Sequence, residues 1–500
     1  MFDKLKIKSK ANSVASSSAP LTPGKPSRED IYRNRQNYGV NLGGCFVLEK
    51  WLFHSIFPEG ANCEAEAVAK LVEENGEDEA RTRLETHWTN FMSDDDWQWL
   101  EDHGVNSVRI PIGYWEIDGG RFTKHTKFEP FGHRVYANAW SIFKKLFVEK
   151  AGEHGISVLV DLHGLPGGAN GSDHSGEHGG DGKAEFWHSS ELQLLICEGL
   201  KFIVKDLLDY ENICGIQIVN ESEFADNPKH QKVYYGAAIN LIREIDGNIP
   251  IIISDGWWPN QWAEWVQELQ NHNNILGVVI DHHVYRCFSD SDKNKSPQQI
   301  IDQLPADVLT NISKNGHGVD FMVGEWSCVL DQSTWDKAEG GANHKRDELV
   351  IEYGNRQLNQ FMERASYGSY FWTFKFESGN GGEWDLKTMT DKGAIKSPLP
   401  NRGVQVPDGN SYERAKEDAN NQQKQSVDKN YDWNRFNDGF TMAWKDSEEF
   451  LRFNGSLIGR IEATKEERLR ENSTERGTPK RPDEFESGYL AGLFQFRSIV

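Results

Sequence analysis

The chain has 500 residues, of which 37% are hydrophobic, so it can bury a large core and is not a wholly disordered or fibrous protein. Its 55 Lys and Arg residues against 77 Asp and Glu residues give a net charge of −22, which argues against nucleic acid or an anionic membrane surface as a partner. No stretch approaches the roughly 18 consecutive apolar residues of a transmembrane helix.

Residues 1–30 are rich in Ser, Pro and Lys, and we expect them to form a flexible tail. This segment lacks the apolar core of a secretory signal. The six cysteines include no CxxC pair, and their spacing suggests neither a zinc site nor a disulfide framework. These observations predict a cytoplasmic protein with reduced thiols and no membrane association.

Between residues 31 and 400, eight short apolar runs alternate with stretches of helical periodicity. The runs span residues 39–44, 107–113, 157–164, 215–221, 250–256, 277–285, 320–326 and 369–375. Because each run is continuously apolar, we expect strands buried on both faces, as in a parallel sheet. Eight such strands predict an α/β fold, a (β/α)8 TIM barrel, with the catalytic domain at residues 31–400.

A doubly wound open sheet is the alternative fold. It would favour a glycine-rich phosphate-binding turn after the first strand, and GVNLGGCF at residues 39–46 does not follow the GxGxxG pattern. The helical pattern between strands is visible at residues 65–88 and 136–155. We therefore favour the barrel.

The composition changes after residue 400. Residues 401–430 are polar and predict a linker or an extended wrap, residues 436–472 have a helical pattern, and residues 486–500 are apolar enough to dock. We expect residues 401–500 to be a C-terminal extension that packs on the barrel rather than an independent domain.

Polar residues stand at the ends of the predicted strands, where a barrel places its active site. They are Asn41, Arg109, His163, Asn220, Glu221, Asp255, His283, Tyr285, Glu325 and Trp372. Glu221 and Glu325 each follow a run that looks buried, and a charge in such a place needs a partner or a function. Two carboxyl groups that face each other across a pocket are the apparatus of glycoside hydrolysis.

A metal-dependent hydrolase is a less favoured alternative. His174 and His178 lie in the His-rich segment DHSGEHGG, but the HxH pair expected on the first strand of such a barrel is missing. His282 and His283 are neighbours in a predicted strand, so they point to opposite faces and cannot bind one ion together. We predict neither a catalytic metal nor a cofactor.

The motifs resemble the fungal exo-β-1,3-glucanases of glycoside hydrolase family 5. The matching segments are residues 39–52, 84–115, 158–176, 216–222, 280–288, 323–327, 371–377 and 381–386, in family order over about 350 residues. The motifs VNE, HxY and GEW are weak singly and specific together. The resemblance implies a retaining β-glucosidase or exo-β-glucanase that acts on a carbohydrate substrate.

The resemblance also implies roles for individual residues. Glu221 would be the acid/base and Glu325 the nucleophile, with Arg109 keeping Glu325 ionised and Tyr285 orienting it. The negative charge of Glu325 would then raise the pKa of Glu221. His283 would lie near the acid/base.

Further residues are implied as sugar contacts. Asn220 would bind the sugar 2-hydroxyl, and His163 and Trp372 would line the first sugar subsite, with Trp372 as a stacking floor. Glu49, in the VLE motif, would hold the terminal sugar, and Asn170 matches another sugar-contacting Asn.

The chain departs from this family in ways that bear on its substrate. Cys45 stands where relatives carry Trp, ANG replaces QNG at residues 169–171, and a WWPNQW loop at residues 257–262 is expected to build outer subsites through Trp257, Trp258 and Trp262. Substrates other than β-1,3-glucan oligosaccharides therefore stay open, including small or lipid-linked β-glucosides. Transglycosylation and a non-catalytic sugar-binding barrel also stay open as alternative functions. The sequence does not decide between exo and endo action, nor does it give the oligomeric state.

Overall fold

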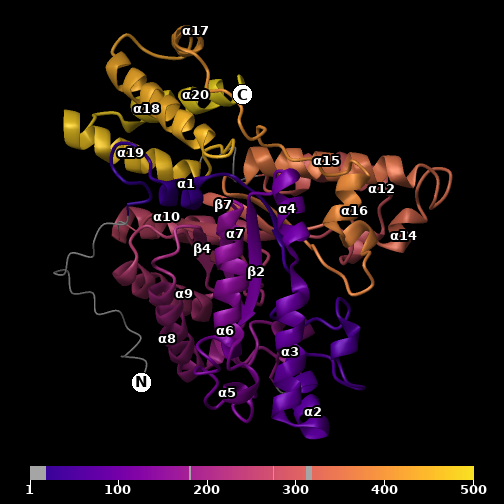
Figure 1. The fold of residues 1–500 in the computed structure, drawn as a ribbon. Coiled ribbons are helices and arrows are strands. Elements are labelled where there is room, and N and C mark those ends of the chain that lie inside the picture. Colours follow the sequence, from indigo (N-terminus) through magenta and orange to yellow (C-terminus); the bar gives the residue numbers. More distant parts are fainter. Residues whose placement is uncertain (1–18, 180–181, 274, 311–317) are drawn as a thin grey trace.

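A computed structural model describes residues 19–179, 182–273, 275–310 and 318–500. Its centre is a closed barrel of eight parallel strands in which β1 pairs with β8 (Figure 1). The strands are β1 (Asn37–Asn41), β2 (Ser107–Gly113), β3 (Ser157–Gly164), β4 (Ile213–Gln217), β5 (Ile251–Ser254), β6 (Val278–Val284), β7 (Asp320–Trp326) and β8 (Gly368–Phe371). The predicted (β/α)8 barrel is confirmed, and closure excludes the open sheet.

The strands are buried on both faces, which explains their continuous apolarity. Side chains that point into the barrel change character along each strand. In β3 the series is Leu159, Asp161 and His163, and an apolar inner cluster that includes Leu159 is followed by polar groups toward the carboxyl end. This gradient makes one end of the barrel a packed core and the other a site for chemistry.

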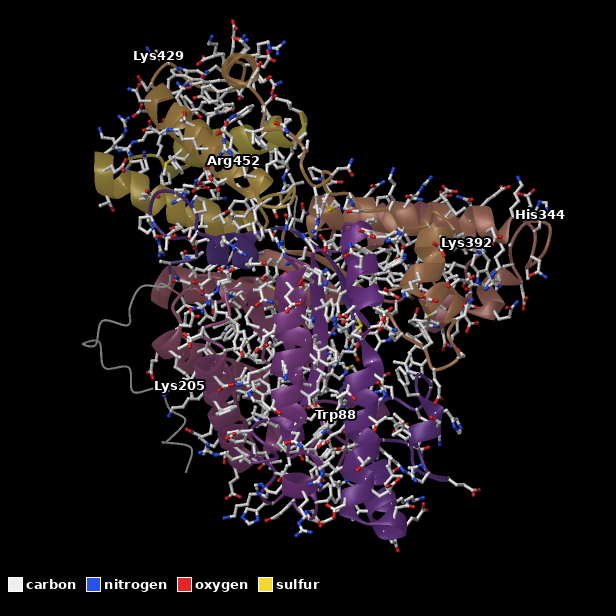
Figure 2. All side chains as sticks on the ribbon, viewed as in Figure 1. Trp88, Lys205, His344, Lys392, Lys429 and Arg452 are labelled. Atoms are coloured by element: carbon white, nitrogen blue, oxygen red, sulfur yellow. The ribbon has the colours of Figure 1, made fainter. Side chains whose placement is uncertain are left out.

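Helices surround the barrel and lie against the outer faces of the strands. The longer ones are α2 (Glu64–Asn75), α3 (Glu77–Phe91), α4 (Asp94–Asp102), α8 (Ser190–Asp206), α9 (Lys229–Ile245), α10 (Pro259–Asn273), α12 (Pro297–Asp307) and α15 (Arg346–Arg364). Trp88 of α3 is fully buried among them (Figure 2). Gly76, at φ 85°, breaks the helical stretch expected at residues 65–88 into α2 and α3.

Shorter helical segments complete the barrel. The stretch expected at residues 136–155 forms α6 (Ala139–Ile142), the π-helical segment η4 (Phe143–Val148) and α7 (Glu149–Glu153). The others are η2 (His54–Ile56), η3 (Tyr114–Glu116), α5 (Gly132–Val135), η5 (Asp173–Ser175), η7 (Phe186–His188), α11 (Asp290–Lys293), α14 (Gln332–Trp335), η8 (Gly382–Trp384) and α16 (Leu386–Asp391).

The C-terminal region is a helical unit at the amino end of the barrel (Figure 1). It comprises α17 (Gly409–Gln423), α18 (Trp433–Arg452), α19 (Ile461–Arg476) and α20 (Pro482–Arg497). Half of the polar stretch at residues 401–430 forms helix α17, because Ala415 and Ala419 bury a narrow apolar stripe in this unit. Helices α18 and α20 pack closely, since a side chain at Gly488 would collide with the carbonyl of Phe436.

Direct contacts fix this unit to the barrel. Asp320, the first residue of β7, accepts the backbone N–H groups of Glu462 and Ala463 at 3.0 Å each, at the start of α19. Arg460 is fully buried and donates to Asn34 Oδ1 at 2.9 Å. The C-terminal unit thus closes the end of the barrel opposite to the strand ends that carry the predicted site.

The chain before the barrel also joins this interface. Of the tail expected at residues 1–30, residues 1–18 lie outside the described residues. In the described part, Leu21 is buried in the same apolar cluster as α20, and Arg468 of α19 donates to the carbonyls of Thr22 and Gly24. Helix α1 (Arg28–Asn34) follows directly, so residues 19–30 are packed rather than a free tail. Within the described residues, none of the helices has both the length and the hydropathy needed to cross a membrane.

Candidate active site

A cavity of about 730 Å³ opens at the carboxyl ends of the strands. Seven of the ten residues that the resemblance assigns to the site line this cavity: Glu49, His163, Glu221, His283, Tyr285, Glu325 and Trp372. Arg109, Asn170 and Asn220 are not among the lining residues, and each hydrogen-bonds to a residue that is. The lining also includes Trp51, Ser172, His174, Trp257, Phe288, Ser289 and Trp384.

The two predicted carboxylates face each other in this cavity. A carboxylate oxygen of Glu221, one of Glu325 and a ring nitrogen of His283 all lie within 4.8 Å of one another. Inverting glycosidases separate their carboxyl groups by about 6.5–9.5 Å, and retaining ones by about 5–5.5 Å. The close approach of the two carboxylate oxygens fits the shorter separation of retaining enzymes.

Glu325 is 5% exposed near the end of β7, and two donors hold its carboxylate. Arg109 Nη1 donates to Oε1 at 2.9 Å, and the Tyr285 hydroxyl donates to Oε2 at 2.8 Å. Both hydrogen bonds fix the direction in which the carboxylate faces the cavity.

Arg109 is fully buried and is itself held by a ring of acceptors. Its guanidinium contacts Asp161 at 2.9 Å, Asn41 Oδ1 at 2.8 Å and Asn220 Oδ1 at 2.6 Å. The cost of burial opposes its charge, but the surrounding carboxylates outweigh this effect and raise its pKa. Arg109 therefore stays a fixed cation beneath the cavity floor.

Glu221 stands just beyond β4 in a left-handed backbone conformation, with φ of 38°. A non-glycine residue in this region is strained and persists only where its surroundings hold it. Asn170 supplies such a restraint, since its Nδ2 donates to the carbonyl oxygen of Glu221 at 2.8 Å. The sugar contact expected of Asn170 stays a prediction, and the structure adds this contact to the backbone of the acid/base candidate.

Two histidines contact the carboxylate of Glu221. His283 Nδ1 lies 2.7 Å from Oε1, and His174 Nε2 lies 3.2 Å from Oε2. Although burial acts to raise the pKa of Glu221, the charges of these histidines lower it well below its usual range. The net pKa of Glu221 is therefore lowered rather than raised, because two histidines contact its carboxylate directly. The contribution expected from the charge of Glu325 stays a prediction.

The pKa values of the two histidines that contact Glu221 move in the opposite direction. Burial opposes the charge on His174, but Glu221, Glu49 and Glu325 raise its pKa to about 9. His283 lies between two carboxylates, with Nε2 at 2.9 Å from Asp281 Oδ2, and its pKa is also raised. In the free site a proton is therefore favoured on the imidazoles over Glu221, whose carboxylate form the histidines stabilise.

Sequence reasoning missed the carboxylates beneath these rings. Asp161 Oδ2 lies 2.6 Å from His163 Nδ1, in the same way that Asp281 holds His283. Each Asp stands two residues before its His, so both point to the same side of a strand. The pattern DxH inside an apolar run was the available signal, and it identifies an oriented histidine.

His163 and Asn220 form a second fixed pair at the cavity. His163 Nε2 lies 3.3 Å from Asn220 Nδ2, while Asn220 Oδ1 accepts from Arg109. The amide of Asn220 thereby has a defined orientation. Glu49 lies across the cavity, where burial raises its pKa and Trp51 Nε1 donates to its Oε2 at 2.7 Å.

Aromatic side chains make up much of the remaining wall. Trp372 lies nearly parallel to the His163 ring, at 18° and 6.2 Å between centroids. Trp51, Trp257 and Phe288 are 52%, 49% and 63% exposed at the mouth, as expected of faces that meet a ligand. Of the WWPNQW residues expected in outer subsites, Trp262 is instead buried in the core, because it lies in α10 against Tyr235.

Comparison with known proteins places this geometry in a family. The model described as Cellulase (glycosyl hydrolase family 5) matches residues 72–378. The chain belongs to glycosyl hydrolase family 5. A second model, described as Glucan 1,3-beta-glucosidase 3 C-terminal domain, matches residues 408–500, which contain helices α17 to α20 of this family 5 enzyme.

Several relatives resemble the enzyme over most of its length. An uncharacterized glycosyl hydrolase of Saccharomyces cerevisiae is 38% identical, covering 99% of this chain and 98% of that protein. Glucan 1,3-beta-glucosidase 3 of Schizosaccharomyces pombe is 33% identical, covering 89% and 92%. Among solved structures, the rutinosidase from Aspergillus niger shares the fold, with a TM-score of 0.58, 18% identity, and coverage of 73% of this chain and 99% of that one. The predicted family is confirmed.

Proposed function

We propose that this family 5 enzyme cleaves terminal β-glucosidic bonds of β-1,3-glucan-type oligosaccharides with retention of configuration, using Glu325 as nucleophile and Glu221 as acid/base. The observation that carries the proposal is the short separation of the two carboxylates, with oxygens within 4.8 Å. The relatives named glucan 1,3-beta-glucosidases support the substrate class.

In the first step, a carboxylate oxygen of Glu325 attacks the anomeric carbon, and the bond from that carbon to the leaving oxygen breaks. Glu221 gives a proton to the leaving oxygen, so the first product departs as an alcohol. Arg109 and Tyr285 keep the carboxylate of Glu325 oriented until its charge is lost in the glycosyl-enzyme.

The ionised state of Glu221 in the free site requires a source for that proton. His283 Nδ1 lies 2.7 Å from Glu221 Oε1 and is positioned to pass its proton to the carboxylate as the leaving oxygen gains charge. Asp281, at the other ring nitrogen, stabilises the charged imidazole before transfer. His174 provides a second protonated partner on the cavity side.

In the second step, Glu221 accepts a proton from a water molecule, whose oxygen attacks the anomeric carbon and releases Glu325. The sugar is held throughout by Asn220 at its 2-hydroxyl, by Glu49 at the terminal unit, and by the faces of His163 and Trp372. A contact to the 2-hydroxyl that tightens as charge develops stabilises the transition state more than the ground state.

Other β-glucosides with an apolar leaving group form the second candidate substrate class. Phe288 and Trp257 at the mouth are among the most exposed large apolar side chains in the described part of the chain. An apolar aglycone would cover these rings, whereas a free oligosaccharide would cover them only with sugar faces.

We also propose that the enzyme works in a reducing, intracellular compartment. All six cysteines lie within the described residues, and all six are buried and unpaired. Cell fractionation with an antibody to the native protein tests this proposal, and recovery in the culture medium contradicts it.

Hydrolysis assays test the function directly. Wild type is expected to release glucose from β-1,3-glucan oligosaccharides and from an aryl β-glucoside. Glu325→Gln should lose about 10³-fold or more in kcat on both, with an unchanged thermal unfolding midpoint. Glu221→Gln should lose about 10²–10⁴-fold on the oligosaccharide, but much less on a dinitrophenyl glucoside, whose leaving group needs no proton.

Three outcomes separate the alternatives. Equal losses by Glu221→Gln on both leaving groups contradict its role as acid. Turnover of the aryl glucoside without the oligosaccharides favours the second substrate class. Sugar binding by wild type without turnover overturns the enzymatic proposal.

A further inference from the structure

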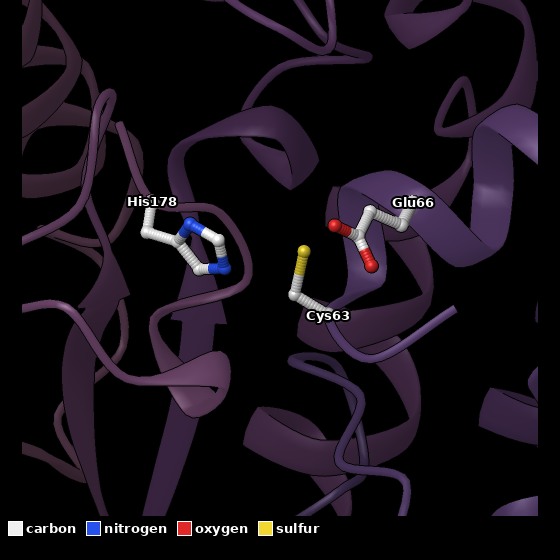
Figure 3. A group of neighbouring side chains, drawn as sticks. All are labelled: Cys63, Glu66 and His178. Atoms are coloured by element: carbon white, nitrogen blue, oxygen red, sulfur yellow. The ribbon is translucent and has the colours of Figure 1, made fainter. Parts of the chain in front are cut away.

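A second cluster of potential ligands lies outside the catalytic cavity. The Cys63 sulfur, a carboxylate oxygen of Glu66 and a ring nitrogen of His178 all lie within 4.8 Å of one another. Figure 3 shows the three side chains turned toward one common space, with Cys63 and Glu66 at the start of α2 and His178 on the segment after β3. None of the three lines the catalytic cavity.

The imidazole of His178 is oriented as a metal ligand would be. Its Nδ1 lies 3.3 Å from the carbonyl oxygen of Gly179, so a proton on Nδ1 donates to that carbonyl. The lone pair of Nε2 then remains available for an ion, which is the usual arrangement of metal-binding histidines. Asp173 Oδ1 lies 3.6 Å from Nε2 and is within reach of a fourth position.

The side chains of Glu66 and Cys63 are also placed to bind an ion in this space. Glu66 Oε2 accepts the backbone N–H of Asn62 at 2.9 Å, which orients the carboxylate, and Oε1 makes no hydrogen bond within the described residues. Cys63 is 2% exposed, so its sulfur is shielded from solvent beside the ligand atoms of the other two residues.

We propose that Cys63, Glu66 and His178 bind one Zn²⁺ ion, with Asp173 or water as the fourth ligand. Thiolate, imidazole and carboxylate are the three ligand types of zinc in proteins, and four-coordinate tetrahedral geometry is its usual choice. On binding, the S–H bond of Cys63 breaks, a sulfur–zinc bond forms and the proton leaves to solvent. No electron is transferred, so the site needs no oxidant or reductant.

Such a site joins α2 to the segment that supports the catalytic acid. The backbone of Ala65 in α2 already donates to the carbonyl of Gly176 at 2.9 Å. The same segment carries His174, which contacts Glu221, and Asn170, which holds its backbone. The ion therefore acts as a structural clamp on this segment, separate from the chemical step.

Cobalt titration tests the site without substrate, so its result is independent of the proposed hydrolysis. Metal-stripped wild type is expected to bind one equivalent of Co²⁺ with a thiolate-to-cobalt charge-transfer band, which Zn²⁺ then abolishes by displacement. Zn²⁺ should also raise the thermal unfolding midpoint. Cys63→Ser should remove the band, while Glu66→Gln and His178→Gln should weaken binding by about 10–100-fold.

Matched variants keep this test decisive. Cys197→Ser, which changes another buried cysteine, and Glu325→Gln should both keep the band. Glu66 is exposed, so Glu66→Gln should fold normally even if Cys63→Ser does not. Absence of a thiolate band in wild type, or its persistence in a folded Cys63→Ser protein, overturns the proposal.

Discussion

The two ends of the barrel bury arginine in opposite ways. At the carboxyl end, Arg109 lies among the carboxylates of Asp161 and Glu325, which raise its pKa despite burial. At the amino end, Arg243 donates to the carbonyls of Ile249 and Leu276, and burial together with the charge of Arg460 lowers its pKa to about 9. Arg243 is thus held by neutral carbonyls, whereas Arg109 is held by charged partners at the proposed site.

Charge at the amino end also joins parts of the chain that are distant in sequence. Arg35 is fully buried, donates to the carbonyls of Asn106 and Gly155, and lies 4.8 Å from the centre of the Tyr32 ring. Burial lowers its pKa to about 10. These groups hold the barrel against α1 and the C-terminal unit. The comparison predicts that damage to the two ends will differ in kind: lost activity at one, lost stability at the other.

The largest difference is expected from a pair of matched variants, Arg109→Met and Arg243→Met. Removal of Arg109 leaves Asp161 and Glu325 buried without a cation, and should lower the free energy of unfolding by about 3–5 kcal/mol and abolish turnover. Removal of Arg243 leaves only carbonyls without a donor, and should cost about 1–3 kcal/mol with kcat nearly unchanged. Urea unfolding and hydrolysis assays measure both quantities. Equal stability losses in the two variants contradict the comparison.

A smaller effect is expected at the junction with the C-terminal unit. Asp320→Ala removes the acceptor of two N–H groups at the start of α19, and should lower the free energy of unfolding by about 1–3 kcal/mol. The proposed catalytic carboxylates lie at the other end, so kcat should change less than twofold. Asp302→Ala, at a side chain 59% exposed, serves as the control for thermal unfolding. A large fall in kcat for folded Asp320→Ala shows that the two ends are coupled.

The smallest effect is a pH-dependent one at the catalytic end. The pKa of His174 is raised from 6.5 to about 9 in the folded protein, so its charge stabilises the fold fully below the unfolded value and this contribution is lost as pH rises through the folded value. His174→Gln should therefore be less stable than wild type by about 1–2 kcal/mol at pH 6, and equally stable near pH 10. Thermal unfolding at several pH values measures the difference. A difference that is constant with pH contradicts this charge assignment.

Much of the fold was predictable because its signals are local. The runs at residues 107–113, 157–164 and 320–326 match β2, β3 and β7 as the structure has them. Residues 409–423 were not recognised as helix, because α17 buries only a narrow stripe and most of its surface is polar. The packing of residues 19–30 was also missed, since Leu21 meets partners that lie far along the chain.

The sequence predicted which residues form the site better than it predicted which of them carry a proton. The strand-end rule found Glu221, Glu325 and their neighbours, but not the position of His174, which enters the cavity from a loop. Its closeness to Glu221 decides where the free site keeps its proton. For the same reason, cysteine spacing gave no sign of the cluster formed by Cys63 and His178, which only the fold brings together.

The assignment of Glu325 as nucleophile is tested most directly by trapping the glycosyl-enzyme. A 2-deoxy-2-fluoro β-glucoside with a dinitrophenyl leaving group slows the second step, and mass spectrometry of the digested enzyme locates the attached sugar. The account predicts one sugar per chain, on the peptide that contains Glu325, with the mass of the Glu221 peptide unchanged. A sugar attached to Glu221, or turnover to the inverted anomer with no covalent adduct, would contradict it.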